Sequence, residues 1–233
     1  MSTISEEECT RRIAEFLEKH KEAYTDTERV YIQRSAFWAL NSKDGFNISN
    51  ELRQILAELN LLEDKKNIYQ GFAKIVTEKF DINRDIVEIA GGIIPSLAKI
   101  IALKQKQGTI TVYDSRVIKT DSCPDNLIVK RQSFTTKTPL PGAEMLIGFM
   151  PCDATMDIIT SACEKNIDFI IGLCEGGTRQ GYGYLEYDDE WISMAKYIAE
   201  LGMEGTDLGS LEVASLEEYG SPYPVIYNKR KKS

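Results

Sequence analysis

The residues best suited to chemistry stand where two apolar runs end in an acidic residue. The first run carries Glu88 near its end and leads directly into Gly91 and Gly92. Glycines in such a turn let the main chain approach a ligand closely, and a helix that opens there presents N–H groups. The second run, GTITVY, is followed by Asp114. An acid at the tip of the second strand of a nucleoside-binding α/β fold accepts hydrogen bonds from ribose hydroxyls. The spacing therefore predicts a nucleoside-type ligand.

Short apolar runs alternate with helical stretches from about residue 84 onward. They predict seven strands, at residues 85–90, 108–113, 126–134, 144–149, 167–173, 210–216 and 224–229. Helices are expected at residues 94–104, 154–165 and 189–201. This alternation favours an α/β fold with a mostly parallel, doubly wound sheet. No crossover helix fits between the last two strands, so we expect an antiparallel C-terminal pair.

The N-terminal part of the chain reads as helices. Ser5 and Glu8 form a capping box, and apolar residues recur at helical spacing behind them. Further helices are expected at residues 27–40, after residue 47 or 49, and at residues 65–80. We therefore predict a helical region at residues 1–80, as a substrate cap or oligomerisation element, and an α/β domain at residues 81–233.

The stretch from Glu88 to Pro95 resembles the first motif of the class I S-adenosylmethionine-dependent methyltransferases, an acid followed by a glycine-rich turn. Asp114 is similar to the acid that holds the ribose in that family, and the antiparallel terminal strands resemble its reversed last strand. The resemblance covers roughly residues 65–233. It implies S-adenosylmethionine as the cofactor, with Glu88 and the turn of Ala90, Gly91 and Gly92 at its methionine end.

The glycine pattern departs from the family at two positions. Glycine is usual where this chain has Ala90 and Ile94, and only Gly92 stands on a preferred glycine position. Ile94 is large enough to crowd the methionine end of the cofactor. The alternative interpretation is that Gly91 and Gly92 only make a tight strand-to-helix turn.

The resemblance also assigns roles at the ends of the third and fourth strands. It places Ser133 and Phe134 beside the adenine, where an ordinary strand end is the alternative. It places Cys152 and Asp153 near the transferring methyl group. Asp153 is the candidate catalytic residue, as a proton acceptor; its alternative role is a helix N-cap. Cys152 is assigned to the substrate pocket.

A glycine- and tyrosine-rich segment follows the fifth strand. Glu175, Tyr182 and Tyr184 are predicted to border the substrate, with a surface loop as the alternative. We expect no metal site, because the five cysteines form no CxxC pair and His20 is the only histidine. His20 stands among charged residues and is expected to be solvated.

Composition limits the choice of partners. The formal net charge of −8 and a pI of about 4.9 make nucleic acid an unfavourable partner. The sequence has neither a membrane-spanning apolar run nor a signal-peptide pattern, so we expect a cytoplasmic protein without membrane contact. A small molecule or a protein is the expected substrate, and a homo-oligomer is compatible with the sequence.

Three functions stay open at the level of sequence. The resemblance favours methyl transfer from S-adenosylmethionine. The altered glycine turn also permits a degenerate, non-catalytic fold that binds a ligand or a partner protein. A dehydrogenase is disfavoured, because its dinucleotide-binding sheet is usually wholly parallel.

Overall fold

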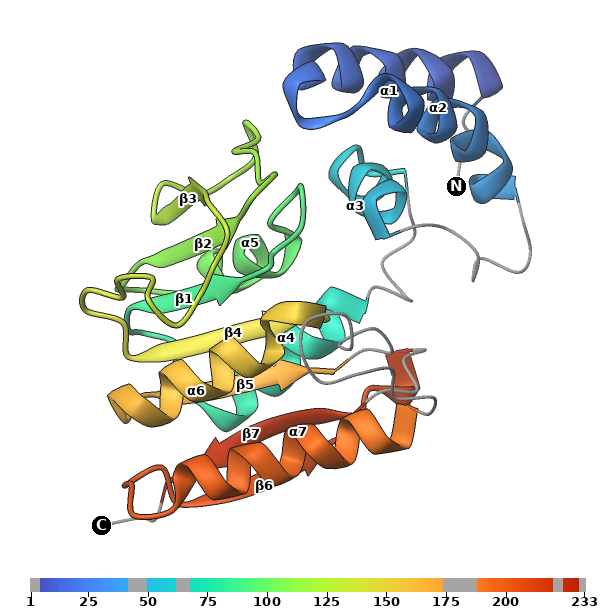
Figure 1. Ribbon diagram of the computed structural model, residues 1–233. Helices are drawn as coiled ribbons and strands as arrows, with labels where there is room; N and C mark the ends of the chain where they lie inside the picture. The colour runs from blue at the N-terminus through green and yellow to red at the C-terminus, as the bar shows by residue number, and fades with distance from the viewer. Residues whose placement is uncertain (1–4, 42–49, 62–67, 174–187, 220–223, 231–233) are drawn as a thin grey trace.

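The computed structural model describes residues 5–41, 50–61, 68–173, 188–219 and 224–230. They form a sheet of seven strands in the order β3-β2-β1-β4-β5-β7-β6 (Figure 1). The strands are β1 (Ile86–Ile89), β2 (Ile110–Asp114), β3 (Leu127–Arg131), β4 (Met145–Phe149), β5 (Asp168–Gly172), β6 (Ser210–Ala214) and β7 (Val225–Lys229). Strands β1 to β5 are parallel, and β7 runs antiparallel to both β5 and β6. The predicted fold class is confirmed, including the antiparallel C-terminal pair.

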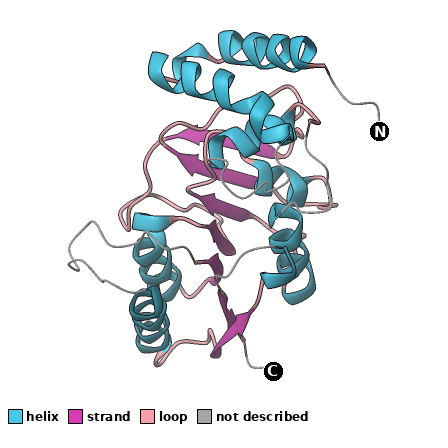
Figure 2. Cartoon of the chain, turned by 90° about the vertical axis from the view of Figure 1, so that its right-hand side faces the viewer, coloured by secondary structure: helices cyan, strands magenta, loops and turns pink. Residues whose placement is uncertain are grey.

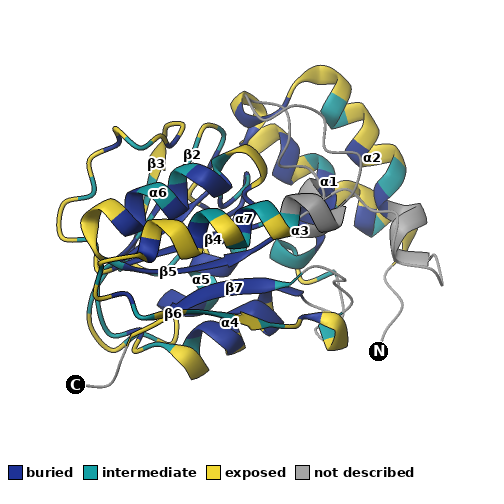
Figure 3. Ribbon diagram, turned by 60° about the horizontal axis from the view of Figure 1, so that its bottom comes forward, coloured by how far each residue is buried: buried dark blue, intermediate teal, exposed yellow. Residues whose placement is uncertain are grey.

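Helices cover both faces of this sheet (Figure 2). Helices α4 (Ile68–Lys79) and α5 (Ser96–Ala102) pack on one face, while α6 (Thr155–Lys165) and α7 (Asp188–Met203) pack on the other. Side chains along a strand alternate between the faces. Ile86 therefore lies in the apolar cluster of α4 and α5, and Val87 lies in that of α6 and α7. Strands β4 and β5 are buried along their whole length (Figure 3).

The remaining helices lie at the carboxyl ends of β1 and β2. They are α1 (Glu6–Lys19), α2 (Asp26–Asn41) and α3 (Asn50–Glu58), with a 3₁₀ turn after α1. The Ser5 hydroxyl accepts the Glu8 N–H at 3.2 Å, which fixes the start of α1 as the sequence predicts. Their apolar side chains pack against Ile93, Ile94 and Ile118, which follow β1 and β2 in the chain.

Apolar packing separates α4 from the other N-terminal helices. Phe72 of α4 is fully buried in the same cluster as the sheet residues Ile86 and Ile147. Helix α4 therefore packs with the sheet, whereas α1 to α3 form a separate apolar cluster, and the division of the chain at residue 80 stays a prediction.

Ion pairs also join the helical region to the sheet. Glu58 of α3 pairs with Lys99 of α5 at 2.9 Å, and Glu28 of α2 pairs with Arg116 after β2 at 2.9 Å. The Glu28–Arg116 pair is exposed and contributes at most about 1 kcal/mol. The Glu58–Lys99 pair is largely buried, with 10% of the Glu58 side chain and 22% of the Lys99 side chain exposed.

The solvated position expected for His20 is wrong. Its side chain is buried, with 8% of its surface exposed, and its ring lies 4.8 Å from the Phe16 ring. The chain turns back directly after α1, which folds the imidazole onto the apolar face of the helix.

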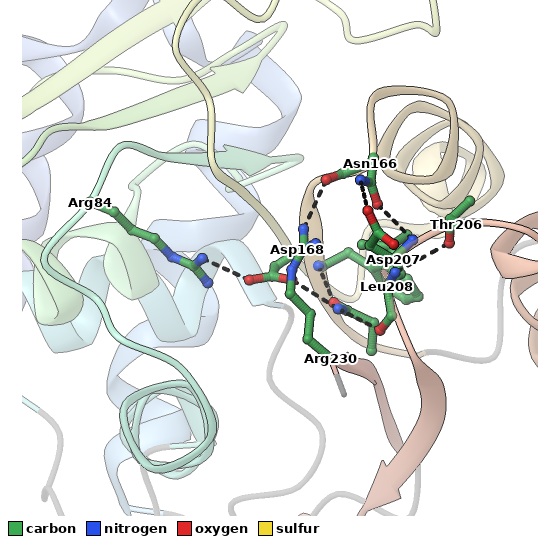
Figure 4. A network of polar contacts seen from close by, with 9 residues as sticks. Arg84, Asn166, Asp168, Thr206, Asp207, Leu208 and Arg230 are labelled. Atoms are coloured by element: carbon green, nitrogen blue, oxygen red, sulfur yellow. Dashed lines mark hydrogen bonds and ion pairs between the residues drawn. The ribbon is translucent and has the colours of Figure 1, made fainter. Parts of the chain in front are cut away.

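A polar network fastens β5 to β7 at the amino end of β5 (Figure 4). Asp168 accepts hydrogen bonds from Arg84 at 2.7 Å, from Arg230 at 2.7 Å and from Asn228 at 2.8 Å. The Asn228 amide in turn accepts the Phe169 N–H at 2.7 Å. These bonds connect the reversed strand β7 to β5 at the end of the sheet opposite to the glycine turn.

Within the described part of the chain, no helix has both the length and the apolar character needed to cross a membrane.

Candidate functional site

The turn after β1 holds two residues in the left-handed backbone region. Ala90 has φ 58° and Gly92 has φ 77°. A non-glycine residue costs roughly 1–2 kcal/mol in that region, and such strain is concentrated at functional sites. At Gly91 a Cβ atom would lie 2.7 Å from Cγ1 of Val112, so only glycine lets the turn pack this closely on β2.

Asp114 joins the tip of β2 to this turn. Its Oδ2 accepts the Gly92 N–H at 3.1 Å, and its Oδ1 accepts the Arg116 N–H at 2.8 Å. The side chain is half-buried. A carboxylate has about four acceptor positions, and hydrogen bonds from the described residues occupy two of them, which leaves two for a ligand. The structure therefore brings Asp114 together with Ala90, Gly91 and Gly92, four of the residues selected from the sequence.

Glu88 lies beneath the turn and is only 1% exposed. Its Oε2 accepts the Ala98 N–H of α5 at 3.0 Å. Burial raises the pKa of Glu88 to about 8, and the charge of Asp114 adds to this rise, while the bond from Ala98 opposes it. Glu88 therefore supports the turn from inside the core and is protonated in much of the folded protein at neutral pH.

We expect Glu88→Gln to remove a pH dependence of stability. The unfolded chain releases the Glu88 proton near its ordinary pKa of 4.5, whereas the folded chain holds it to about pH 8. The wild type therefore loses stability as pH rises through that window, by roughly 2–4 kcal/mol from this group. Urea unfolding at pH 5 and pH 8 should show a smaller loss in the variant. The exposed Glu164→Gln serves as the control, and equal pH slopes for Glu88→Gln and wild type would contradict the assignment.

Gln54 of α3 also reaches the glycine turn, which sequence reasoning missed. Its Nε2 donates to the Gly91 carbonyl at 3.4 Å and to the Tyr69 hydroxyl at 3.1 Å, and its Oε1 accepts the Ile94 N–H at 3.4 Å. The Ile94 side chain packs among α1 to α3 and is 1% exposed. The only sequence signal for Gln54 is a polar residue within an apolar helical stripe.

Alanine at Gly92 should destabilise the turn more than backbone strain alone. The new Cβ would lie 2.6 Å from the Gln54 Nε2, and the φ of 77° disfavours any side chain. We expect a loss of about 2–3 kcal/mol in the free energy of unfolding. Gly205→Ala is a matched control, because Gly205 has φ 76° and its new Cβ would meet no atom of the described residues within 4 Å. Equal losses in urea unfolding would show that the Gln54 contact does not matter.

The two candidate residues that follow β3 differ in how far they are buried. Ser133 is exposed, whereas Phe134 is 8% exposed. The Phe134 ring lies edge-on to the Tyr113 ring, with the centroids 6.2 Å apart. Because Tyr113 immediately precedes Asp114, Phe134 packs beside the tip of β2.

The segment after β4 carries further left-handed backbone. Met150 has φ 52° and Cys152 has φ 46°, on either side of Pro151. Cys152 and Asp153 are both exposed. The alternative role of Asp153 as a helix cap is wrong, because α6 has Ala154 at its N-cap position and no side-chain capping bond.

An aromatic contact links the tip of β4 to the glycine turn. The Tyr69 ring lies edge-on to Phe149 at the end of β4, with the centroids 5.2 Å apart, and the Tyr69 hydroxyl accepts the bond from Gln54. Helix α3 therefore contacts the turn after β1, helix α4 contacts the end of β4, and Gln54 and Tyr69 join the two helices.

Three predicted substrate residues, Glu175, Tyr182 and Tyr184, lie outside the described residues. Among the residues that the structure does describe, no three histidine, cysteine or acidic side chains gather as a metal site.

Comparison with known proteins gives structural likeness only. No protein-family model matches the chain, and no curated protein matches its sequence. Among solved structures, the fibrillarin pre-rRNA processing protein of Methanococcus jannaschii aligns with a TM-score of 0.47 at 14% identity, over 72% of this chain and 78% of that one. The precorrin-6y C5,15-methyltransferase of Geobacter metallireducens aligns with a TM-score of 0.46 at 12% identity, over 73% and 92%. The magnesium protoporphyrin IX methyltransferase of Synechocystis PCC 6803, solved with S-adenosylhomocysteine, aligns with a TM-score of 0.45 at 10% identity, over 85% and 94%.

Proposed function

We propose that the chain binds S-adenosylmethionine at the carboxyl edge of its sheet and transfers the methyl group to an acceptor. The observation that carries this proposal is the bond from the Gly92 N–H to Asp114, which joins the glycine turn after β1 to the acid at the tip of β2. The reversed direction of β7, the last strand of the chain, agrees with the reversed last strand that the class I resemblance implies. A fold alone does not fix a function, so the proposal rests on this site.

The residues present fit an adenosine cofactor. Asp114 keeps acceptor positions for ribose hydroxyls, and its Oδ2 already binds the main-chain N–H of Gly92 in the turn. Phe134 and Ser133 are the candidates beside the adenine. We assign Glu88 a supporting role beneath the turn, because its carboxyl group is buried against α5.

The cofactor, when bound, supplies an electrophilic methyl group on a sulfonium. The residues of the chain contribute mainly by holding two reactants in line, which is a large source of rate enhancement. We propose Asp153, which is exposed after β4, as the residue that accepts a proton from the acceptor, and Cys152 as a residue of the substrate pocket. Glu175, Tyr182 and Tyr184 stay proposed substrate residues. The acidic net charge favours a small-molecule or protein acceptor over nucleic acid.

Thermal unfolding with a panel of ligands tests this proposal. A ligand at about 100 times its Kd stabilises the folded state by roughly 2.7 kcal/mol, which raises the Tm of a chain this long by about 5–10 °C. We expect this shift with S-adenosylmethionine and S-adenosylhomocysteine and none with a nicotinamide dinucleotide. No shift with either sulfur ligand at millimolar concentration would contradict the proposed enzymatic function and favour the non-catalytic alternative.

A further inference from the structure

The Gln54 side chain satisfies polar groups of the glycine turn in a pattern that resembles a ligand. Its amide oxygen takes the Ile94 N–H and its amide nitrogen gives a proton to the Gly91 carbonyl, both at 3.4 Å. The second amide proton goes to the Tyr69 hydroxyl at 3.1 Å. The residue is 4% exposed, so these bonds form away from solvent.

An α-amino-acid group offers the same pair of functions on adjacent atoms. Its carboxylate accepts an N–H and its ammonium donates to a carbonyl. We infer that Gln54 stands in for the amino-acid end of the cofactor at this turn and decides which ligands enter. This inference rests on the proposed function, because it concerns the same site.

The packing at Gly92 supports the inference that the Gln54 amide lies on the face of the turn where the cofactor would bind. A Cβ on Gly92 would meet the Gln54 amide at 2.6 Å, 2.9 Å and 3.1 Å for its nitrogen, oxygen and carbon. The amide therefore fills the space that the glycine leaves open. A ligand that uses this space must first displace Gln54.

The need to displace Gln54 makes the site selective for ligands that carry an amino-acid end. Leaving the Ile94 N–H or the Gly91 carbonyl without a partner in a buried place costs about 1–3 kcal/mol for each group. A ligand with an amino-acid end restores both bonds when Gln54 leaves. A nucleoside without that end cannot restore them, so Gln54 stays in place and such a ligand gains nothing from the turn.

Calorimetric titration of the full chain with two probes tests the inference. The probes are S-adenosylhomocysteine and 5′-methylthioadenosine, which shares the nucleoside and sulfur but lacks the amino acid. In Gln54→Ala we expect S-adenosylhomocysteine to bind about tenfold more tightly, because the competing side chain no longer reduces the binding-competent fraction. Binding of 5′-methylthioadenosine should change less than twofold.

Two further variants keep the test interpretable. Gln54→Met preserves the approximate size of the side chain and removes its hydrogen bonds, so it should also tighten S-adenosylhomocysteine binding. It provides the test if the Gln54→Ala protein does not fold. Gln33→Ala on α2 removes an exposed glutamine and should change neither affinity.

The outcomes separate this inference from the proposed function. If the wild type binds S-adenosylhomocysteine and the Gln54 variants bind it equally or more weakly, the inference is wrong while the proposed function stands. If neither the wild type nor the variants bind either probe, the proposed function fails and the inference falls with it.

Discussion

An Asp114→Ala variant is expected to bind S-adenosylhomocysteine at least about 100-fold more weakly than the wild type. The substitution removes the acceptor for two ribose hydroxyls, and hydrogen bonds to a charged group contribute about 1.5–3 kcal/mol each. It also releases the Gly92 N–H from Oδ2 and the Arg116 N–H from Oδ1, which loosens the turn. Calorimetric titration measures the change directly, since each tenfold loss of affinity is about 1.4 kcal/mol.

Two companions make the Asp114 result specific. Asp114→Asn keeps one oxygen acceptor and should give an intermediate loss. Asp125→Ala removes an exposed acid at the amino end of β3, whereas Asp114 lies at the carboxyl end of the neighbouring β2, and should leave the affinity unchanged. A folded Asp114→Ala protein that binds within threefold of the wild type would contradict the ribose role.

An Asp168→Ala variant is expected to lose about 3–5 kcal/mol of folding free energy, the usual cost of removing one partner of a buried ion pair. Burial alone would raise the pKa of Asp168, but hydrogen bonds from Asn228, Arg84 and Arg230 outweigh it and hold the pKa below its ordinary value. The carboxylate is therefore stabilising at neutral pH, and its contribution is lost as pH falls through that lowered pKa. Without it, the Arg84 guanidinium loses its carboxylate partner in a place where only 18% of its side chain is exposed.

Urea unfolding at neutral pH measures the Asp168 effect. Asp168→Asn preserves the shape and part of the hydrogen bonding, so its loss should be smaller. Asp207→Ala, in the same corner of the molecule but exposed, should cost less than about 1 kcal/mol. A loss for Asp168→Ala as small as that for Asp207→Ala would show that the network does not fasten β7.

The sequence was sufficient to predict the sheet because its strands are short, apolar and separated by helical spacing. Residues such as Ile147 and Ile170 belong to strands buried on both faces, which appear as continuous apolar runs. The reversal of β7 was predictable from the short connection after β6. The order of the strands was not derivable from their spacing and is seen only in the structure.

The site was less predictable, because its contacts come from residues distant in the chain. Asp114 and Gly92 are separated by 22 positions and were both selected. Gln54 lies 37 positions before Gly91, and a single polar residue in a helical stripe does not indicate which turn it meets. The burial of Glu88 depends on whether its side chain points toward α5 or toward the ligand, a choice that the sequence of β1 does not determine.

Hydrogen exchange measured peptide by peptide, with and without S-adenosylhomocysteine, tests the central claim most directly. The claim is that the cofactor binds between the glycine turn and Asp114. It predicts slower exchange with ligand in peptides covering residues 89–95 and 113–118, and no change in residues 206–216 on the distant edge of the sheet. Unchanged exchange in both predicted segments at saturating ligand would contradict the claim.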